Sequence, residues 1–408
     1  MLDVEKIRQD FPMLNGATMH GQPLIYFDNG ATTLKPQCVI DAVCNYLTNY
    51  SGNAHRGDYD LSHDVDTQFE KTRDLVAKLI NCDRKEVVYT YGSTDGLNMI
   101  AFGYGMTHLD EGDEILLTVA EHASNTLPWF EVCDTVGSTV KYIDLDDEGR
   151  LTVANVLKAI SDKTKIISIA QVSNVLGFDG PIKEICQIAH ERGIIVCVDG
   201  AQSIPHEKVD VQTLDIDFLV FSGHKMCGPT GVGILYGKYD LLQETKPTRW
   251  GGGSNARYKS CGRIKLKNAP AKFEAGTPNI EGVIGLGAAI EYLIEIGMDN
   301  IRDYELELRQ YAVKKMLELD NLEVYNPNGH GAIAFNIKGD FSQDGASLFN
   351  TYGIAIRAGQ HCAKILDEFL DVSQTLRASF YFYNTFEEID RFIEVCKKGD
   401  DFLDAFFG

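Results

Sequence analysis

A lysine and an aspartate each stand at the end of an apolar segment of this chain. Lys225 follows shortly after the run at 218–221, and Asp199 directly follows the run at 194–198. Short continuous apolar runs of this kind are typical of strands buried on both faces of a sheet. In open α/β sheets, ligands bind beyond the carboxyl ends of the strands, where both residues are expected to lie. Desolvation lowers the pKa of a lysine, so Lys225 is suited to attack a carbonyl, although alone it equally fits a lysine that leaves the sheet edge for water.

The order and spacing of these two residues fit a pyridoxal phosphate site. In such a site a lysine forms a Schiff base with the cofactor, and an aspartate keeps the pyridine nitrogen protonated. The segment 92–96, Gly-Ser-Thr-Asp-Gly, lies between a predicted strand at 86–90 and a predicted helix. Backbone N–H groups and the hydroxyls of Ser93 and Thr94 at the positive end of that helix favour a phosphate group. Alone, the same segment also fits an ordinary helix N-cap.

Composition limits the partners and the location that we expect. The 408 residues include 38 Lys and Arg against 59 Asp and Glu, which gives a net charge of −21. So acidic a chain is not expected to bind nucleic acid or an anionic membrane, and a basic protein partner fits it better. The ten cysteines form no CxxC pair, so we expect reduced, mostly core thiols in a cytoplasmic protein. We also expect no signal peptide and no membrane span.

Predicted strands alternate with predicted helices over much of the chain. This alternation calls for an α/β fold with a mainly parallel sheet covered by helices on both faces. We expect an arm over 1–20 that packs with the small domain, a large cofactor-binding domain over 21–290 and a smaller α+β domain over 291–408. The stretch 247–279 holds a Gly triplet and seven basic residues, which by themselves indicate a flexible surface loop.

Several short motifs together resemble a known family. They include VDGAQ at 198–202, SGHK at 222–225, FEAGTPN at 273–279 and RAGQHCA at 357–363. In these motifs, and in their order from about residue 24 to the C-terminus, the chain resembles the fold-type I pyridoxal phosphate enzymes of the class V aminotransferase group. It is most similar to the Suf-type (group II) cysteine desulfurases. The resemblance implies a seven-stranded, mainly parallel sheet in the large domain and a cysteine loop in the small one.

The resemblance also implies roles for individual residues. The catalytic residues would be Lys225, Cys362 and His122. The cofactor would be held by Lys225, Asp199, Gln202, His122, Ser93, Thr94, Ser222, His224 and Thr277, and the substrate by Arg377, Asn174, Arg357 and His55. Arg377 has the guanidinium geometry to grip a carboxylate with two hydrogen bonds, although alone it also fits an internal ion pair. Thr277 is expected to reach the cofactor phosphate of a partner subunit, which implies a homodimer.

Other residues of the chain bear on metal binding, on the Cys362 loop and on the contacts expected with partners. The loop at 52–64 holds His55 and His63 among carboxylates, but its spacing fits no metal-ligand pattern, so we expect no metal. Cys362 follows a polar segment and is expected to open a short helix. Ala123, Trp250 and Gln360 stand where the family usually has His, Glu and His. Contacts to the partner and between subunits are therefore expected to differ from those of the best-known relatives.

The expected activity is conversion of L-cysteine to L-alanine, with the sulfur left as a persulfide on Cys362. A sulfur-acceptor protein, either a Suf-type scaffold or a transfer protein, would then take it for iron–sulfur cluster assembly. The alternatives are a selenocysteine lyase, a cysteine sulfinate desulfinase or a transaminase. Cys362 argues against simple transamination, which needs no thiol, but not against the first two. A non-catalytic sulfur carrier or scaffold is a further alternative. The joint presence of Lys225, Asp199, Cys362 and Arg377 argues against it.

Overall fold

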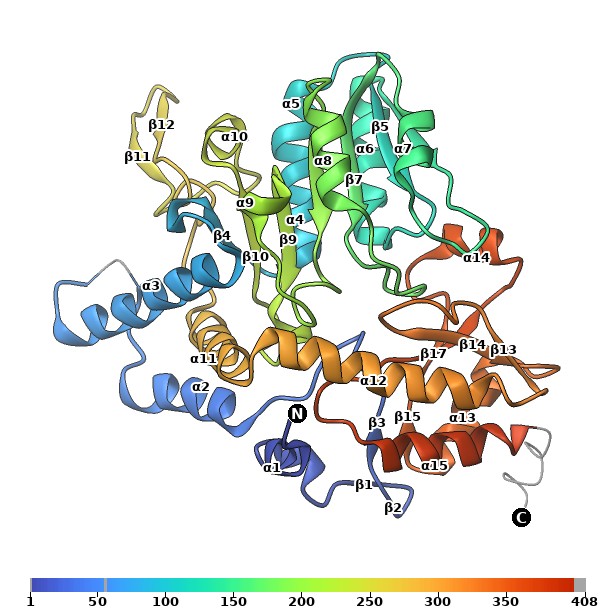
Figure 1. Ribbon diagram of the computed structural model, residues 1–408. Coiled ribbons are helices and arrows are strands. Elements are labelled where there is room, and N and C mark those ends of the chain that lie inside the picture. Colours follow the sequence, from blue (N-terminus) through green and yellow to red (C-terminus); the bar gives the residue numbers. More distant parts are fainter. Residues whose placement is uncertain (1, 55–56, 400–408) are drawn as a thin grey trace.

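A seven-stranded sheet forms the centre of the molecule (Figure 1), in a computed structural model that describes residues 2–54 and 57–399. Its strands are β4 (Val87–Thr90), β5 (Glu114–Thr118), β6 (Thr139–Ile143), β7 (Thr164–Ala170), β8 (Ile195–Asp199), β9 (Phe218–Ser222) and β10 (Gly233–Gly237). Their order across the sheet is β4-β10-β9-β8-β7-β5-β6. β10 is antiparallel to both of its neighbours, whereas the other pairs are parallel. The expected mainly parallel, seven-stranded sheet is confirmed.

Side chains of the central strands alternate between two hydrophobic cores, one on each face of the sheet. In β9, Phe218 and Val220 pack in one core, and Leu219 and Phe221 pack in the other. The first core includes residues of α4 (Ser93–Met99) and α6 (Leu127–Val136), and the second includes residues of α3 (Asp60–Ile80), α8 (Ile182–His190) and α11 (Ile280–Ile296). Because both faces are covered, these strands are apolar at consecutive positions, which is the pattern seen in the sequence.

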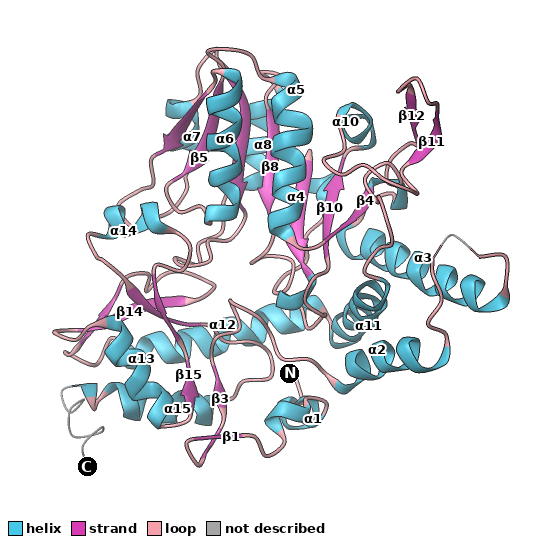
Figure 2. Ribbon diagram, turned by 180° about the vertical axis from the view of Figure 1, so that it is seen from behind, coloured by secondary structure: helices cyan, strands magenta, loops and turns pink. Residues whose placement is uncertain are grey.

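A second, smaller sheet lies in the C-terminal part of the chain (Figure 2). Its strands, in the order β13-β14-β17-β16, are β13 (Leu322–Val324), β14 (Ile333–Ile337), β17 (Thr375–Ala378) and β16 (Arg357–Gly359). The helices of this part are α12 (Met298–Met316), α13 (Ser342–Thr351), α14 (Lys364–Leu370) and α15 (Phe386–Cys396). All pairs in this sheet are antiparallel, in agreement with the expected α+β domain.

The N-terminal segment joins the C-terminal part of the molecule. In α1 (Val4–Gln9), Arg8 forms an ion pair of 2.8 Å with Glu388 of α15. The short strand β3 (Ile25–Tyr26) pairs in parallel with β15 (Ile354–Ala355) rather than with the central sheet. The backbone of this segment therefore crosses into the region that we assigned to the small domain. The division of the chain at residues 20 and 290 stays a prediction.

The basic segment at 247–279 contains a hairpin that extends from one side of the molecule (Figures 1 and 2). Its strands are β11 (Asn255–Tyr258) and β12 (Ile264–Leu266), and most of their residues are exposed. A strand that is exposed to solvent on both faces shows no alternation of apolar and polar residues, so only a loop was expected here.

The described cysteines are all free, but they are less buried than expected. Cys133, Cys186, Cys197, Cys227 and Cys396 are buried, whereas Cys38, Cys44, Cys261 and Cys362 are exposed. The expectation of mostly core thiols was therefore wrong for the cysteines on α2 (Gln37–Asn49) and on the hairpin. No helix within residues 2–54 and 57–399 is long and apolar enough to cross a membrane.

Candidate active site

A cavity of about 180 Å³ lies at the carboxyl ends of β7, β8 and β9, closed on one side by β16, β17 and the Cys362 loop. Twelve of the fourteen candidate residues line it, and they come from both parts of the molecule. From the large part these are Ser93, Thr94, His122, Asn174, Asp199, Gln202, Ser222, His224 and Lys225, and from the C-terminal part Arg357, Cys362 and Arg377. Thr277 and His55 are not among them. Thr277 is exposed and lies outside the cavity, and His55 falls outside the described residues.

Lys225 and Asp199 are brought together by two neighbouring parallel strands. Asp199 is the last residue of β8, and Lys225 ends a single 3-10 turn, Gly223–Lys225, after β9. Burial lowers the pKa of Lys225 to about 8, although the Asp199 carboxylate favours its charged form. Burial likewise raises the pKa of Asp199, which the Lys225 ammonium opposes. The Asp199 Oδ1 accepts a hydrogen bond of 3.0 Å from the Ala201 N–H.

Hydroxyl groups gather where β4 turns into α4. Gly92 makes this turn with φ of +147°, a conformation that is essentially restricted to glycine. The backbone N–H of Ser93 donates to the Ser222 hydroxyl at 2.8 Å, and the two hydroxyls lie 2.9 Å apart. The Thr94 hydroxyl lies 2.7 Å from that of Ser124. Polar hydrogens at the positive end of a helix suit a phosphate group.

His122 follows the end of β5 and is half-buried in the cavity wall. Its Nδ1 accepts a hydrogen bond of 3.1 Å from the Ser124 N–H. Burial, together with the positive charges of Lys225 and Arg377, lowers the pKa of His122 to about 4. The imidazole is therefore neutral at physiological pH and has Nε2 as its protonated nitrogen.

Arg377 supplies a buried cation from β17 to the opposite wall. Its guanidinium donates to the Asn174 carbonyl at 3.0 Å and to Asp28 Oδ1 at 3.3 Å, and its Nε has no partner among the described residues. Arg357 also pairs with Asp28, at 3.4 Å. Asp28 thus balances two arginines, a role that we did not predict. The signal was the polar sequence Asp-Asn-Gly at 28–30, shortly after the strand at 25–26.

The Cys362 loop adopts an uncommon backbone conformation. His361 and Cys362 have φ of +49° and +57°, in the left-handed region that L-residues rarely occupy. Hydrogen bonds hold both carbonyls: Asn174 Nδ2 donates to His361 O at 2.9 Å, and the Ala123 N–H donates to Cys362 O at 2.7 Å. The exposed Cys362 precedes α14, which begins at Lys364. The expected short helix is present, two residues beyond the cysteine.

His361 lines the same cavity and was not among the candidate residues. Its Nε2 lies 3.0 Å from the Thr375 carbonyl, which can only accept, so Nε2 carries the proton. Its Nδ1 is buried without a partner among the described residues. Burial, followed by the charge of Arg377, lowers the pKa of His361 to about 3, so this imidazole is neutral too.

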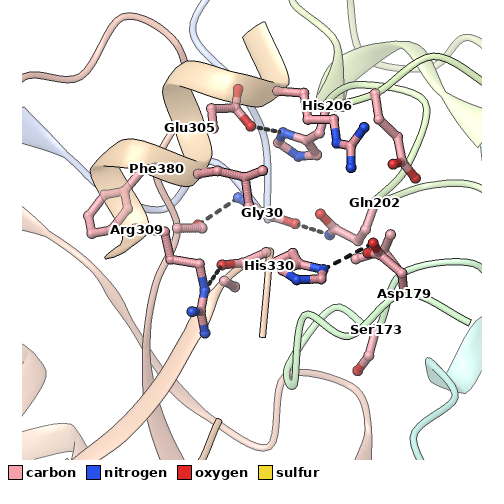
Figure 3. Close-up of a pocket in the computed structure, with 16 residues that line it drawn as sticks. Gly30, Ser173, Asp179, Gln202, His206, Glu305, Arg309, His330 and Phe380 are labelled. Atoms are coloured by element: carbon pink, nitrogen blue, oxygen red, sulfur yellow. Dashed lines mark hydrogen bonds and ion pairs between the residues drawn. The ribbon is translucent and has the colours of Figure 1, made fainter. Parts of the chain in front are cut away.

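A second cavity lies beside the first and shares Gly30, Val172 and Gln202 with it (Figure 3). Across it, His206 Nδ1 lies 2.7 Å from Glu305 Oε2, and His330 Nδ1 lies 3.0 Å from Asp179 Oδ2. Glu305 belongs to α12 and His330 to the loop before β14, whereas their partners follow strands of the central sheet. These pairs therefore hold the C-terminal part against the large part next to the Lys225 cavity.

The residues of the Lys225 cavity fit pyridoxal phosphate. Asp199 is a buried carboxylate suited to a pyridinium N–H, Lys225 is an amine whose pKa is lowered, and the hydroxyls at α4 suit the phosphate. Within the described residues, no group of three His, Cys, Asp or Glu side chains is placed to hold a metal ion.

The fold and this site define an α/β pyridoxal phosphate enzyme of fold type I. The chain belongs to the aminotransferase class-V family, whose model matches residues 25–392. It is 43% identical to a probable cysteine desulfurase of Halalkalibacterium halodurans over the full length of both chains. Two solved structures are also similar, each with 36% identity. The cysteine desulfurase CsdA from Escherichia coli has a TM-score of 0.91 over 98% of this chain and 99% of that one. The apo cysteine desulfurase from Thermococcus onnurineus NA1 has a TM-score of 0.92 over 98% of both chains.

Proposed function

We propose that this protein is a pyridoxal phosphate-dependent cysteine desulfurase, which converts L-cysteine to L-alanine and collects the sulfur on Cys362. The observation that carries the proposal is the place of Cys362. An exposed thiol, on a loop held in an uncommon backbone conformation, lines the same cavity as Lys225, Asp199 and Arg377. The similarity to cysteine desulfurases over nearly the whole chain supports it.

The cofactor would be held by residues at the ends of β8 and β9 and at the start of α4. Lys225 would bind it covalently, Asp199 would pair with the ring nitrogen, and the hydroxyls of Ser93, Thr94 and Ser222 would bind its phosphate. Gln202 and His224 complete this wall of the cavity. When bound, pyridoxal phosphate supplies an electron sink for the bonding electrons at the substrate Cα.

The substrate would be held by groups of the opposite wall. Arg377 would bind the α-carboxylate of L-cysteine with two parallel hydrogen bonds, while Asn174 and Arg357 lie beside it. Lys225, once released as a free amine, would take the Cα proton on Nζ, which its lowered pKa permits near neutral pH. Because His122 is neutral above pH of about 4, its imidazole is available to hold or pass a proton.

Cys362 would then take the sulfur. Its thiolate attacks the substrate sulfur, so that an S–S bond forms while the Cβ–S bond breaks. The bonding electron pair stays on Cβ, which a proton converts into the methyl group of alanine. The sulfur remains on Cys362 as a persulfide, from which a thiol reductant or a sulfur-acceptor protein removes it.

The test is product formation from L-cysteine in the presence of a thiol reductant. We expect equal amounts of alanine and sulfide from the wild type, and neither from Lys225→Ala. Cys44→Ala, which removes another exposed thiol on α2, is the matched control and should match the wild type. If L-cysteine gave no alanine while L-selenocysteine or L-cysteine sulfinate did, the chain would be a lyase or desulfinase instead.

We further propose a homodimer in which Thr277 of one protomer contacts the cofactor phosphate of the other. Two facts support this arrangement. Thr277 is exposed and lies outside the cavity of its own chain, and the cavity already gathers all the other described candidate residues. The physiological acceptor is proposed to be a protein of the iron–sulfur assembly system, with basic residues that suit this acidic chain.

A further inference from the structure

Lys35 is a partly buried lysine that none of the functions above uses. It lies between β3 and α2, and burial lowers its pKa to about 8. Within the described part of the chain its ammonium forms no ion pair. Its hydrogen bonds go instead to the Thr33 carbonyl at 2.5 Å, the His224 carbonyl at 3.1 Å and the Thr32 hydroxyl at 3.4 Å. A cation without a carboxylate partner is costly to bury, so its contacts need an explanation.

The contact with His224 connects Lys35 to the turn that carries Lys225. The His224 carbonyl belongs to the peptide bond directly before Lys225, within the single turn Gly223–Lys225. This carbonyl receives two further bonds from Thr33, through its N–H at 3.0 Å and its hydroxyl at 3.2 Å, and one from the Thr32 hydroxyl at 2.9 Å. Four donors thus converge on one oxygen that has two lone pairs.

Among these donors the ammonium of Lys35 is the one that carries a charge. A hydrogen bond from a charged donor is about twice as strong as one from a neutral donor, so Lys35 contributes a charge-assisted bond that neither threonine can supply. The neighbouring Cys227 N–H also donates to the Thr33 hydroxyl, at 2.8 Å. The segment 32–35 therefore contacts the Lys225 turn at the His224 carbonyl and the chain just after the turn at Cys227.

We propose that Lys35 is a positioning residue that fixes the Lys225 turn by holding the carbonyl of His224. The inference rests on the proposed cofactor site, because it assigns to Lys35 the task of aiming the Lys225 amine. The charge of Lys35 has a second effect in the same place. After burial and the charge of Lys225, it helps to lower the pKa of His224 to about 4, which keeps that imidazole neutral in the cavity wall.

The experiment measures the reaction of Lys225 itself. The cofactor is removed from the full chain, pyridoxal phosphate is added back, and the growth of the visible absorbance band gives the rate at which Lys225 captures it. No cysteine is present, so the result is independent of desulfurase activity. A desulfurase test that fails while this one succeeds would leave the role of Lys35 intact.

The variants are Lys35→Met, which removes the charge at similar length, and Lys35→Arg, which keeps it. Lys272→Met is the matched control, because Lys272 is also buried, also has a pKa lowered to about 8, donates to the Gln243 carbonyl at 2.8 Å, and does not line the Lys225 cavity. We expect Lys35→Met to slow capture by about tenfold or more, since a hydrogen bond from a charged group is lost. Lys35→Arg should recover most of the rate, and Lys272→Met should keep the wild-type rate.

Circular dichroism and thermal unfolding separate this effect from a general loss of structure. Lys35→Gln, which keeps an uncharged donor, replaces Lys35→Met if the latter does not fold. An equal capture rate in wild type and in the folded, uncharged Lys35 variant would overturn the proposal. So would a failure of both uncharged variants to fold, because Lys35 would then serve the fold rather than the turn.

Discussion

At the scale of single residues, the site is a set of charges arranged around one amine. Burial lowers the pKa of Lys225, as do the charges of Arg377 and Arg357, while Asp199 and Cys362 act in the opposite direction. Asp28 holds both arginines in place and moderates their combined charge. The chemistry of the site therefore depends on groups from the N-terminal segment, the central sheet and the small sheet together.

The lowered pKa of Lys225 predicts how cofactor capture depends on pH. Below pH of about 8 the amine of the cofactor-free protein is protonated and unreactive, and above it the amine is free to attack. The capture rate should therefore rise about tenfold per pH unit below this midpoint and level off above it. Stopped-flow absorbance from pH 6 to pH 10 measures it. A midpoint near that of a free lysine, at about 10.4, would show that the site does not lower the pKa.

Replacing Arg377 by Lys should weaken substrate binding. The substitution keeps the charge but removes the planar pair of donors, so we expect KM for L-cysteine to rise by about tenfold to a hundredfold. Arg309→Lys is the control, because Arg309 is equally buried but donates to the carbonyls of Gly331, Pro327 and Asn326 outside this cavity. For the control, thermal unfolding should show a lower stability, while steady-state kinetics should show an unchanged KM. An unchanged KM in Arg377→Lys would place the carboxylate elsewhere.

At the scale of elements, the site is built where strands end. Most of its residues lie at or just beyond the ends of β5, β7, β8 and β9. The sequence predicted β8 and β9 from their apolar runs, each followed by polar residues. Apolar runs did not reveal β13, β6 or the hairpin β11–β12, because strands that are short or exposed to solvent carry no such run. Nor did they reveal the tautomer of His361 or the ion pairs of Asp28, which depend on segments far apart in the chain.

The turn before α4 predicts that Gly92→Ala damages cofactor binding. A side chain at φ of +147° is strained by about 1–3 kcal/mol, and the added Cβ would meet the Ser222 hydroxyl at 3.3 Å. We expect a lower melting temperature and a weaker affinity for pyridoxal phosphate, measured by thermal unfolding and by equilibrium dialysis. Gly16→Ala is a control, with φ of +94° and no atom within 4 Å of the new Cβ. If both variants bound the cofactor equally well, the turn would not contribute to the cradle.

At the scale of the whole molecule, the site is closed by parts that lie far apart in the sequence. The arm forms an ion pair with α15, and β3 pairs with β15. Across the second cavity, His206–Glu305 and Asp179–His330 link the C-terminal part to the central sheet. The resemblance in the motifs was sufficient to predict the family, the central sheet and the gathering of the site. It did not disclose that residues 25–26 pair with the C-terminal part, because strand pairing over such a distance leaves no local pattern.

The proposed role of Thr277 can be tested in a mixed dimer. We expect the protein to have twice the mass of its 45.3 kDa chain in solution, by light scattering. Thr277→Ala should bind pyridoxal phosphate several-fold more weakly, by the loss of one phosphate contact. A dimer of one Thr277→Ala chain and one Lys225→Ala chain should regain one tight site, because the intact Thr277 faces the intact Lys225. If the mixed dimer bound as weakly as Thr277→Ala, Thr277 would act within its own chain.

The central claim is that Cys362 carries the sulfur released in the Lys225 cavity, and mass spectrometry of the protein tests it most directly. The enzyme is treated with L-cysteine in the absence of a reductant, alkylated and digested. We predict that the peptide containing Cys362 gains one sulfur atom, and that Cys362→Ala keeps the visible absorbance of the bound cofactor but loses sulfide release. The added sulfur on Cys261 or Cys44 instead, or equal sulfide release by Cys362→Ala, would contradict the account.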